Sequence, residues 1–394
     1  MRKKIFTLLF CLMTVGALWA QNPAKWMRYP AISPDGSKIA FAYQGDIYVV
    51  DSQGGNAHQL TSNPAHDYHP VWSPDGSKLA FASNRKGNFD VYLMDADGGN
   101  PTRLTTHSSN EIPFCFTPDG KEIIYSGLIQ DPAASLTFRS YGELYKVSAK
   151  AGRPEQVFAV PADEATMSQD GKFIYYNDIK GVENRWRKHH TSSVVRDIWM
   201  FDTQNKKYTK LTATNGESRT PVLSPDGKTV YFLGERGGSF NVFKFAVADT
   251  KNVTPVTSFK KDPLRFLSTS RNGTLCYTFQ GEIYTQQPNG KPQKISVNVK
   301  RDDSAEETEV LKSGREASEA VVSSDGKQMA FIFRGDVFVS SVGYGTTKQI
   351  TSTPEQERQV AFSPDGKKLV YSGERNGSWN LYVASIADTK EPNF

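Results

Sequence analysis

The chain has 394 residues, of which 23% are charged and 12% aromatic, and its 31 glycines and 21 prolines are spread throughout. Its 47 basic and 42 acidic side chains give a net charge of +5. Arg2, Lys3 and Lys4 belong to an expected leader, so the rest holds 47 less three, or 44, basic against 42 acidic side chains. That near balance argues against a nucleic-acid partner. No segment after the first twenty residues is apolar enough to span a membrane.

The first twenty residues read as a signal peptide. A basic start is followed by an apolar stretch from Ile5 to Leu18 that is too short to span a membrane, and Ala20 precedes a plausible cleavage site. Leu18 stands where a small residue is usual, which leaves the cleavage position open. Cys11 lacks the small residues expected before a lipidated cysteine. We therefore expect an exported protein, periplasmic or secreted.

A four-residue sequence motif then recurs along the chain. Full copies are Ser33-Pro34-Asp35-Gly36, Ser73-Pro74-Asp75-Gly76, Thr117-Pro118-Asp119-Gly120, Ser224-Pro225-Asp226-Gly227 and Ser363-Pro364-Asp365-Gly366. Weaker copies are Ser168-Gln169-Asp170-Gly171, Ser270-Arg271-Asn272-Gly273 and Ser324-Asp325-Gly326, so the Asp or Asn stands at 35, 75, 119, 170, 226, 272, 325 and 365. A repeat of this length, rich in short β-type runs, is typical of β-propeller blades.

Residues 68–105 indicate what one repeat contains. An apolar run ending at Trp72 leads into the motif, and residues 78–82 follow it with the alternation of a strand. Proline, aspartate and glycine in this order suit a tight turn closed by a positive φ. Two further strand-like runs, residues 90–94 and 102–105, complete a four-stranded blade.

The spacing predicts an all-β protein with a six-bladed β-propeller over residues 24–295. Residues 296–316 contain the charged run from Lys300 to Glu309 and read as a linker. Residues 317–394 hold two more repeats, the second without its fourth strand, and we interpret them as the first two blades of a second, incomplete propeller. The chain would then be the amino-terminal part of a longer protein. A single eight-bladed ring is the competing interpretation.

The fourth repeat carries a basic insertion. Its fixed positive charges are Arg185, Arg187, Lys188 and Arg196, and His189 and His190 lie among them. If the insertion faces the propeller axis, it forms an anion site suited to a peptide carboxylate through bidentate arginine contacts. The alternative is a surface loop whose Trp186 packs on a blade and whose charges are solvated. Adjacent histidines on a strand point to opposite faces, which argues against a metal site.

Catalytic and cofactor motifs are missing from the sequence. It has no Gly-x-Ser-x-Gly, no His-Glu-x-x-His, no phosphate-binding glycine loop and no Cys-x-x-Cys. Cys115 and Cys276 lie in apolar runs of repeats that would face each other across a six-membered ring, so we expect no disulfide. We expect no catalytic residue, cofactor or metal in this chain.

The repeats resemble a known group of propellers. Pro70-Val71-Trp72-Ser73-Pro74-Asp75-Gly76 followed by Asp90-Val91-Tyr92-Leu93-Met94-Asp95 is similar to repeats of TolB, dipeptidyl-peptidase propellers and tricorn proteases. The tricorn group fits best, because the first blade directly follows the leader, a second set follows the sixth blade, and the fourth carries Arg185-Trp186-Arg187-Lys188-His189-His190 before Arg196-Asp197-Ile198-Trp199. TolB fits less well, because its propeller follows an α/β domain.

This resemblance implies a function. Tricorn-like proteins are large serine peptidases in which a six-bladed and a seven-bladed propeller precede catalytic and PDZ-like domains, and the propellers act as peptide channels. The resemblance implies that residues 24–295 gate peptide or protein substrates and that residues 317–394 are the first part of the seven-bladed propeller. It also implies that the catalytic Ser and His residues lie beyond Phe394. Arg185, Arg187, Lys188 and Arg196 are a counterpart, in chemistry, of the basic cluster that anchors substrate carboxylates. The resemblance is also compatible with a homo-oligomer. Export is a departure, because the best-known members are cytosolic. The alternative is a non-catalytic periplasmic propeller of the TolB type that binds protein partners.

Overall fold

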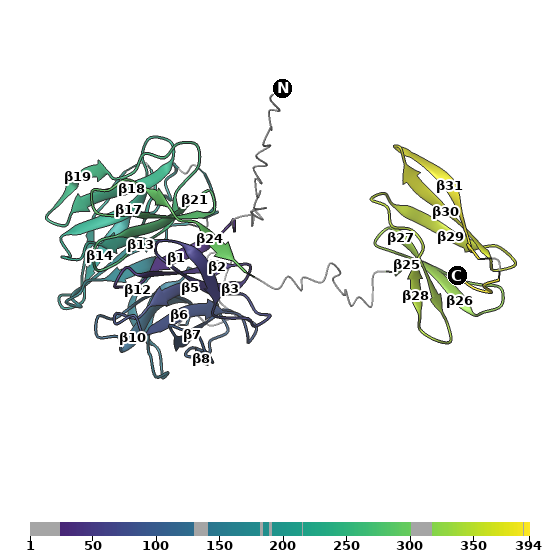
Figure 1. Cartoon of the computed structure of the whole chain (residues 1–394), viewed down its shortest axis with the longest axis horizontal. Helices are drawn as coiled ribbons and strands as arrows, with labels where there is room; N and C mark the ends of the chain where they lie inside the picture. The colour runs from purple at the N-terminus through teal and green to yellow at the C-terminus, as the bar shows by residue number, and fades with distance from the viewer. Residues whose placement is uncertain are drawn as a thin grey trace, which may run out of the picture. The chain divides into compact units, whose positions relative to one another are not determined.

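The computed structural model describes residues 24–129, 141–181, 184–188, 191–214, 216–300, 317–388 and 390–394. All the regular structure in these ranges is β (Figure 1). They contain no helix that is long and apolar enough to cross a membrane. The chain divides into two compact units, Met1–Asp302 and Asp303–Phe394.

The first unit consists of antiparallel meanders in which consecutive strands pair. The first sheet, in the order β1-β2-β3-β4-β24, contains β1 (Arg28–Ile32), β2 (Lys38–Tyr43), β3 (Asp46–Asp51), β4 (Gly55–Gln59) and β24 (Val297–Val299). The second contains β5 (Asp67–Trp72), β6 (Lys78–Ser83), β7 (Asp90–Asp95) and β8 (Thr102–Arg103). A seven-stranded sheet contains β9 (Ile112–Phe116), β10 (Glu122–Gly127), β11 (Glu143–Ser148), β12 (Glu155–Met167), β13 (Phe173–Asp178), β14 (Ile198–Asp202) and β15 (Lys207–Lys210). Two four-stranded sheets follow, β16 (Ser218–Leu223), β17 (Thr229–Glu235), β18 (Phe240–Ala246) and β19 (Asp249–Pro255), then β20 (Arg265–Thr269), β21 (Leu275–Phe279), β22 (Glu282–Gln286) and β23 (Gln293–Lys294).

Strand β12 accounts for the seven-stranded sheet. Its first half pairs with β11 and its second half, from Ala162, pairs with β13, so two meanders share one long strand. We call β1, β5, β9, the second half of β12, β16 and β20 the inner strands. Each inner strand contacts the next in this order, and β20 contacts β1. They therefore surround a common axis.

The recurring Ser-Pro-Asp-Gly motif forms the turn after each inner strand. In the second copy, the Ser73 hydroxyl donates to Asp75 at 2.6 Å and accepts from the backbone N–H of Lys78 at 2.9 Å. Gly76 has φ 74°, and its N–H donates to the carbonyl of Ser73. Hydrogen bonds from Ser73 and Ser77 lower the pKa of Asp75 to about 2. The predicted turn chemistry is thus confirmed, and it stabilises the backbone.

Apolar side chains fill the space between neighbouring sheets. Strands β2 and β6 bury nearly every residue, because each sheet is covered on both faces. One cluster joins Ile47 of the first sheet to Leu79 and Phe81 of the second. Each meander is therefore stabilised by its neighbours.

The last strand of the unit adds to the edge of the first sheet. Strand β24 lies in the stretch that we expected to be a linker, and it pairs in parallel with β4. The N–H of Gly55 donates to the carbonyl of Ser296 at 2.7 Å. Gly54 has φ 92°, and a Cβ built on it would lie 2.5 Å from the same carbonyl oxygen. The close approach of β24 therefore requires glycine at position 54.

This contact gives a first prediction. Gly54→Ala should lower the free energy of unfolding of the first unit by about 1–3 kcal/mol more than Gly55→Ala, because only the first substitution overpacks the junction. The matched control has a similarly positive φ of 117° and open space around its Cβ. Urea unfolding followed by tryptophan fluorescence measures both. Equal losses of unfolding free energy in the two variants would show that backbone strain alone causes the loss and that β24 can shift to accommodate the added Cβ.

The second unit contains two sheets. One is formed by β25 (Ala317–Val322), β26 (Gln328–Phe333), β27 (Asp336–Ser341) and β28 (Thr347–Gln349), and the other by β29 (Glu357–Phe362), β30 (Lys368–Arg375) and β31 (Ser378–Ser385). Their shared core includes Ile332, Val337, Leu369 and Tyr371. On β31, Leu381 and Val383 are exposed.

Candidate functional site

The inner strands share a backbone distortion. Five of them have a non-glycine residue with positive φ four places before the first residue of the turn, namely Tyr29 (52°), His69 (58°), Glu164 (50°), Thr220 (54°) and Phe266 (56°). At each, the pairing with the next strand shifts by one residue, as in a β-bulge. Non-glycine residues adopt this conformation at a cost, and bulges redirect side chains near functional sites.

Strand β9 reaches the same result differently. Its equivalent position is Pro113, whose ring fixes φ near −65° and so forbids the positive value. The extra residue there is Phe114. Six side chains, one from each inner strand, thus line one level of the axis, and we call them the floor ring: Tyr29, His69, Phe114, Glu164, Thr220 and Phe266.

The floor ring forms one end of a cavity of about 480 Å³ that the inner strands line. Tyr29 contacts Phe266 and His69, with ring centroids 4.3 and 5.0 Å apart. His69 contacts Phe114 at 5.5 Å. On the other side, the Thr220 hydroxyl donates to Glu164 at 2.7 Å. The ring is therefore aromatic on one side and polar on the other.

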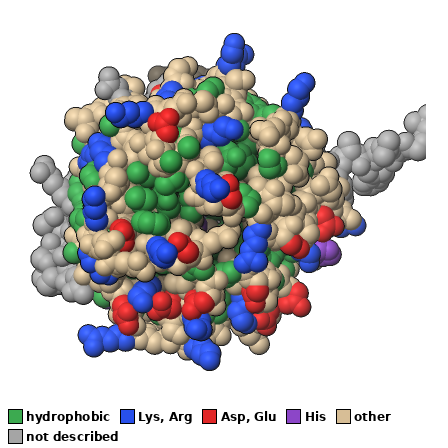
Figure 2. Space-filling model, turned by 90° about the vertical axis from the view of Figure 1, so that its left-hand side faces the viewer, with side chains coloured by type: hydrophobic (Ala, Val, Ile, Leu, Met, Phe, Trp, Pro, Cys, Tyr) green, Lys and Arg blue, Asp and Glu red, His purple; other side chains and the backbone are tan. Residues whose placement is uncertain are grey.

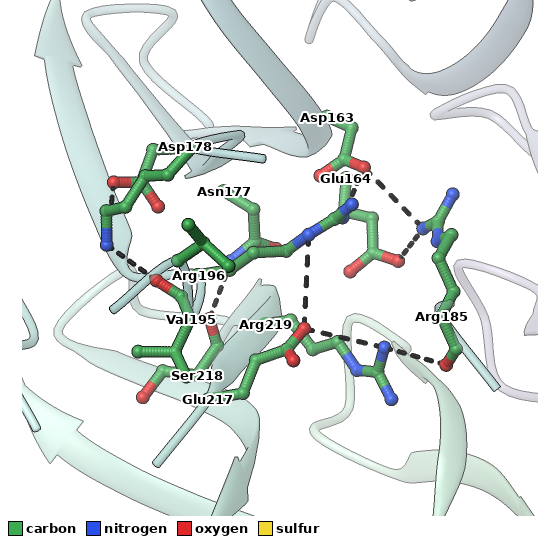
Figure 3. A network of polar contacts seen from close by, with 12 residues as sticks. Asp163, Glu164, Asn177, Asp178, Arg185, Val195, Arg196, Glu217, Ser218 and Arg219 are labelled. Atoms are coloured by element: carbon green, nitrogen blue, oxygen red, sulfur yellow. Dashed lines mark hydrogen bonds and ion pairs between the residues drawn. The ribbon is translucent and has the colours of Figure 1, made fainter. Parts of the chain in front are cut away.

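An ion-pair network lies behind the polar side (Figure 3). Arg185 pairs with Glu164 and lies 3.7 Å from Asp163. Arg196 donates to Asp163 at 2.5 Å and lies 3.9 Å from Glu217. One further guanidinium, that of Arg219, is 3.6 Å from Glu217. The network thus joins β12 to β16 through the insertion of the fourth repeat.

Arg185 is the most exposed member of this network and lines the cavity. Its side chain is 39% exposed, against 10% for Arg196. Burial disfavours its charge, but Glu164 and Asp163 outweigh burial and raise its pKa. Burial alone would likewise raise the pKa of Glu164, whereas Arg185, Arg219 and Arg196 together lower it to about 2. Both partners are therefore charged at neutral pH.

Three arginines hold the insertion against the ring. Arg265 donates to the carbonyls of Arg185, Trp186 and Arg187 at 2.8–3.0 Å. Arg219 donates to the carbonyl of Arg185 at 3.2 Å. The guanidinium of Arg28 lies 5.0 Å from the Trp186 ring centroid, a cation–π contact. The described part of the insertion is thus fixed at the end of the cavity and not free in solvent.

His69 presents a neutral imidazole to this site. Burial and the positive charge of Arg185 lower its pKa to about 4. Its Nδ1 is buried and has no hydrogen-bond partner. At neutral pH the ring therefore adds polarity without charge.

The structure brings only some of the predicted site residues together. Arg185 lines the cavity, and Arg196 shares Asp163 with it but does not line the cavity. Lys188 pairs with Asp262 at 3.0 Å, and Arg187 is exposed. His189 and His190 lie outside the described residues. The carboxylate-binding role of these residues remains a prediction, with Arg185 the best placed to serve it.

The floor ring and the three arginines that hold the insertion were not predicted from the sequence. A signal for the arginines was present, because the residue five places before the turn is Arg28, Arg219 and Arg265 in three repeats of the first unit. The ring residues share a position but no chemical type. Within the ranges that the structure describes, no group of three or more His, Cys, Asp or Glu side chains could hold a metal, and Cys115 and Cys276 are free.

Comparison with known proteins gives consistent matches. The family described as the tricorn protease N-terminal beta propeller domain matches residues 24–292. The crystal structure of the tricorn protease is 21% identical, with a TM-score of 0.69 over 92% of this chain and 34% of that chain. A putative TolB from Agrobacterium tumefaciens is 20% identical, with a TM-score of 0.49 over 59% of this chain and 81% of that chain.

A sequence relative carries a peptidase name. The "Uncharacterized peptidase YuxL" of Bacillus subtilis (strain 168) is 25% identical over 224 residues, 54% of this chain and 29% of that protein. The chain thus spans about a third or less of the length of this relative and of the tricorn protease structure. The match over residues 24–292 covers most of the chain, and the chain therefore belongs to the tricorn protease N-terminal β-propeller domain family.

Proposed function

We propose that this chain is the substrate-gating, peptide-channel region of an exported tricorn-like serine peptidase whose catalytic and PDZ-like domains lie outside it. Residues 24–295 would form one six-bladed propeller and residues 317–394 the first two blades of a second. The closed series of contacts among the six inner strands supports the first count. The match to the tricorn propeller family supports the link to a peptidase.

One observation carries the proposed function, namely the cavity on the axis of the first unit. All six inner strands line it, and Figure 2 shows a face of the molecule on which hydrophobic side chains gather, with charged side chains of both signs around and among them. Its volume of about 480 Å³ falls in the range of ligand sites. It therefore suits a segment of extended peptide and is too small for a folded domain.

The floor of the cavity favours an anionic end of such a peptide. The ion-pair network balances the guanidiniums of Arg185, Arg196 and Arg219 against the carboxylates of Asp163, Glu164 and Glu217, and Arg265, which donates to backbone carbonyls beside it, adds a fourth guanidinium. One positive charge is in excess. Burial and Arg219 lower the pKa of Arg265 to about 10, so it stays charged at neutral pH. A carboxylate beside Arg185 would balance this charge and gain charge-assisted hydrogen bonds.

This assignment predicts a preference for free carboxyl termini. Replacing both Arg185 and Arg187 by Ala should weaken binding of a peptide with a free carboxyl terminus about 10–100-fold, as expected for one lost hydrogen bond to a charged group. Binding of the amidated peptide should change less. Isothermal titration calorimetry measures both.

The single substitution Arg187→Ala is the matched control, because this exposed side chain does not line the cavity. It should leave both affinities nearly unchanged. Equal losses for the carboxylate and the amide in the double variant would remove the carboxylate role.

Two further observations would test the proposal that this chain is part of a longer, exported serine peptidase. The coding sequence beyond codon 394 should specify a serine-peptidase and a PDZ-like segment, and a stop codon there would favour the binding propeller of the TolB type. Export should leave a mature amino terminus near Gln21, which amino-terminal sequencing of the periplasmic fraction would detect.

A further inference from the structure

The wall of the cavity has a different chemistry from its floor. Two residues before each turn begins, every inner strand has a small or medium-sized residue that lines the cavity: Ala31, Val71, Cys115, Thr166, Val222 and Ser268. The second residue of each turn then lines the mouth, and it is proline in four of the six repeats. The wall therefore offers contact surface without formal charge.

Charged residues are confined to the two ends. Of the described residues that line the cavity, four of the five with formal charge are Glu164, Arg185, Arg219 and Arg265, all at the floor end, and the fifth is Arg271 at the mouth. Arg271 is the turn residue of the sixth repeat, and its backbone N–H donates to the carbonyl of Pro34. Between the two ends no counter-charge lines the wall.

A charged side chain held at the middle of this wall would lose water without gaining a partner. Burial of an unpaired charge is strongly unfavourable, whereas an uncharged side chain of similar size loses little. The hydroxyl of Ser268 is already engaged, because it donates to Pro30 and accepts from Ile32. The wall therefore discriminates by charge more than by shape.

We propose that the cavity selects peptides whose last few residues have uncharged side chains, held extended along this wall while the terminal carboxylate meets Arg185. This substrate class rests on the proposed peptide-channel function. Val222, on β16 between the floor ring and the turn, is the central selecting residue.

The test compares three hexapeptides with free carboxyl termini that differ only at the third residue from the end, which is Gln, Glu or Lys. Binding is followed by the fluorescence of Trp72 and Trp186, which both line the cavity. Isothermal titration calorimetry is a second readout, because it does not depend on the response of either tryptophan. We expect the Gln peptide to bind at least 10-fold more tightly than either charged peptide.

Variants at the wall test the cause. Val222→Glu should improve binding of the Lys peptide at least 10-fold relative to the Gln peptide, and Val71→Glu should act in the same direction if the first variant folds poorly. The control is Val342→Glu, an exposed position of the second unit, which should change nothing.

The outcomes separate the two proposals. Equal binding of the three peptides, or unchanged preference in both wall variants, would overturn the charge selection and leave the peptide channel standing. Failure of every peptide to bind would overturn the proposed function and this inference with it.

Discussion

Replacing Arg196 by methionine is expected to lower the free energy of unfolding of the first unit by about 3–5 kcal/mol. The Arg196 side chain is 10% exposed, and its partners Asp163 and Glu217 are 7% and 6% exposed. Methionine fills a similar volume but leaves two buried carboxylates without this guanidinium. Removing one partner of a buried ion pair costs far more than the intact pair contributes.

The matched control is Lys188→Met. Lys188 also pairs with an acid, Asp262, but their side chains are 49% and 38% exposed. Exposed pairs contribute about 0–1 kcal/mol, so the control should be nearly as stable as the parent.

Urea unfolding gives both values, and hydrogen exchange of the β12 and β16 amides locates the loss. A change below about 1 kcal/mol for Arg196→Met, of the size expected for exposed pairs, would show that the network is not essential to the junction of these strands.

Replacing Glu111 by glutamine is expected to stabilise the protein at pH 8 and to have little effect at pH 4.5. Glu111 is fully buried, just before β9, with Thr105 and Asp90 as its polar neighbours. Burial, reinforced by the charge of Asp90 and opposed by Thr105 and Arg103, raises its pKa to about 7. Arg103 pairs with Asp90 at 2.8 Å.

The sign of the pH effect follows from the raised pKa. Between about pH 4.5 and 7 the folded protein retains a proton on Glu111 that the unfolded chain has released, so stability falls as pH rises through this window. The loss is complete above pH 7 and amounts to about 3 kcal/mol, at ~1.4 kcal/mol for each unit of pKa. Glutamine replaces the O–H donor of the protonated acid by an N–H donor and cannot ionise.

Thermal unfolding at a series of pH values measures this effect. The variant should lose the decline in stability between pH 4.5 and 7, and should gain about 2–3 kcal/mol at pH 8. Asp97→Asn, which removes one acidic charge at an exposed turn position, is the control. A parallel pH dependence in Glu111→Gln and the parent would show that Glu111 is ionised in the folded protein.

The repeating turns could be predicted because their chemistry is local. Ser73, Asp75 and Gly76 contact one another within four residues, so sequence alone specifies the structure. The strand pattern around them follows from the same period, and the all-β architecture and the tricorn relationship were predicted correctly.

The floor ring could not be predicted in the same way. Tyr29 and Phe266 are bulky residues that disfavour a positive φ, and they adopt it because the neighbouring inner strands fix the backbone there. The position of the basic insertion also depends on long-range pairing, because the partner of Arg185 is Glu164, which lies 21 residues earlier and on another element. Charge density indicated a site, and only the fold showed which charge faces the cavity.

The closure of the first unit bears on how the chain folds. Ile39 and Phe41, near the start, pack against Cys276, Ile283 and Val297, near the end. The N–H of Met27 donates to the carbonyl of Gly281. Contacts across such long sequence separations form late, because the chain entropy lost on closing the loop must be overcome first. During synthesis the first sheet therefore has one apolar flank without its partner until about residue 299 has emerged, and this flank is where we expect a chaperone to bind the nascent chain.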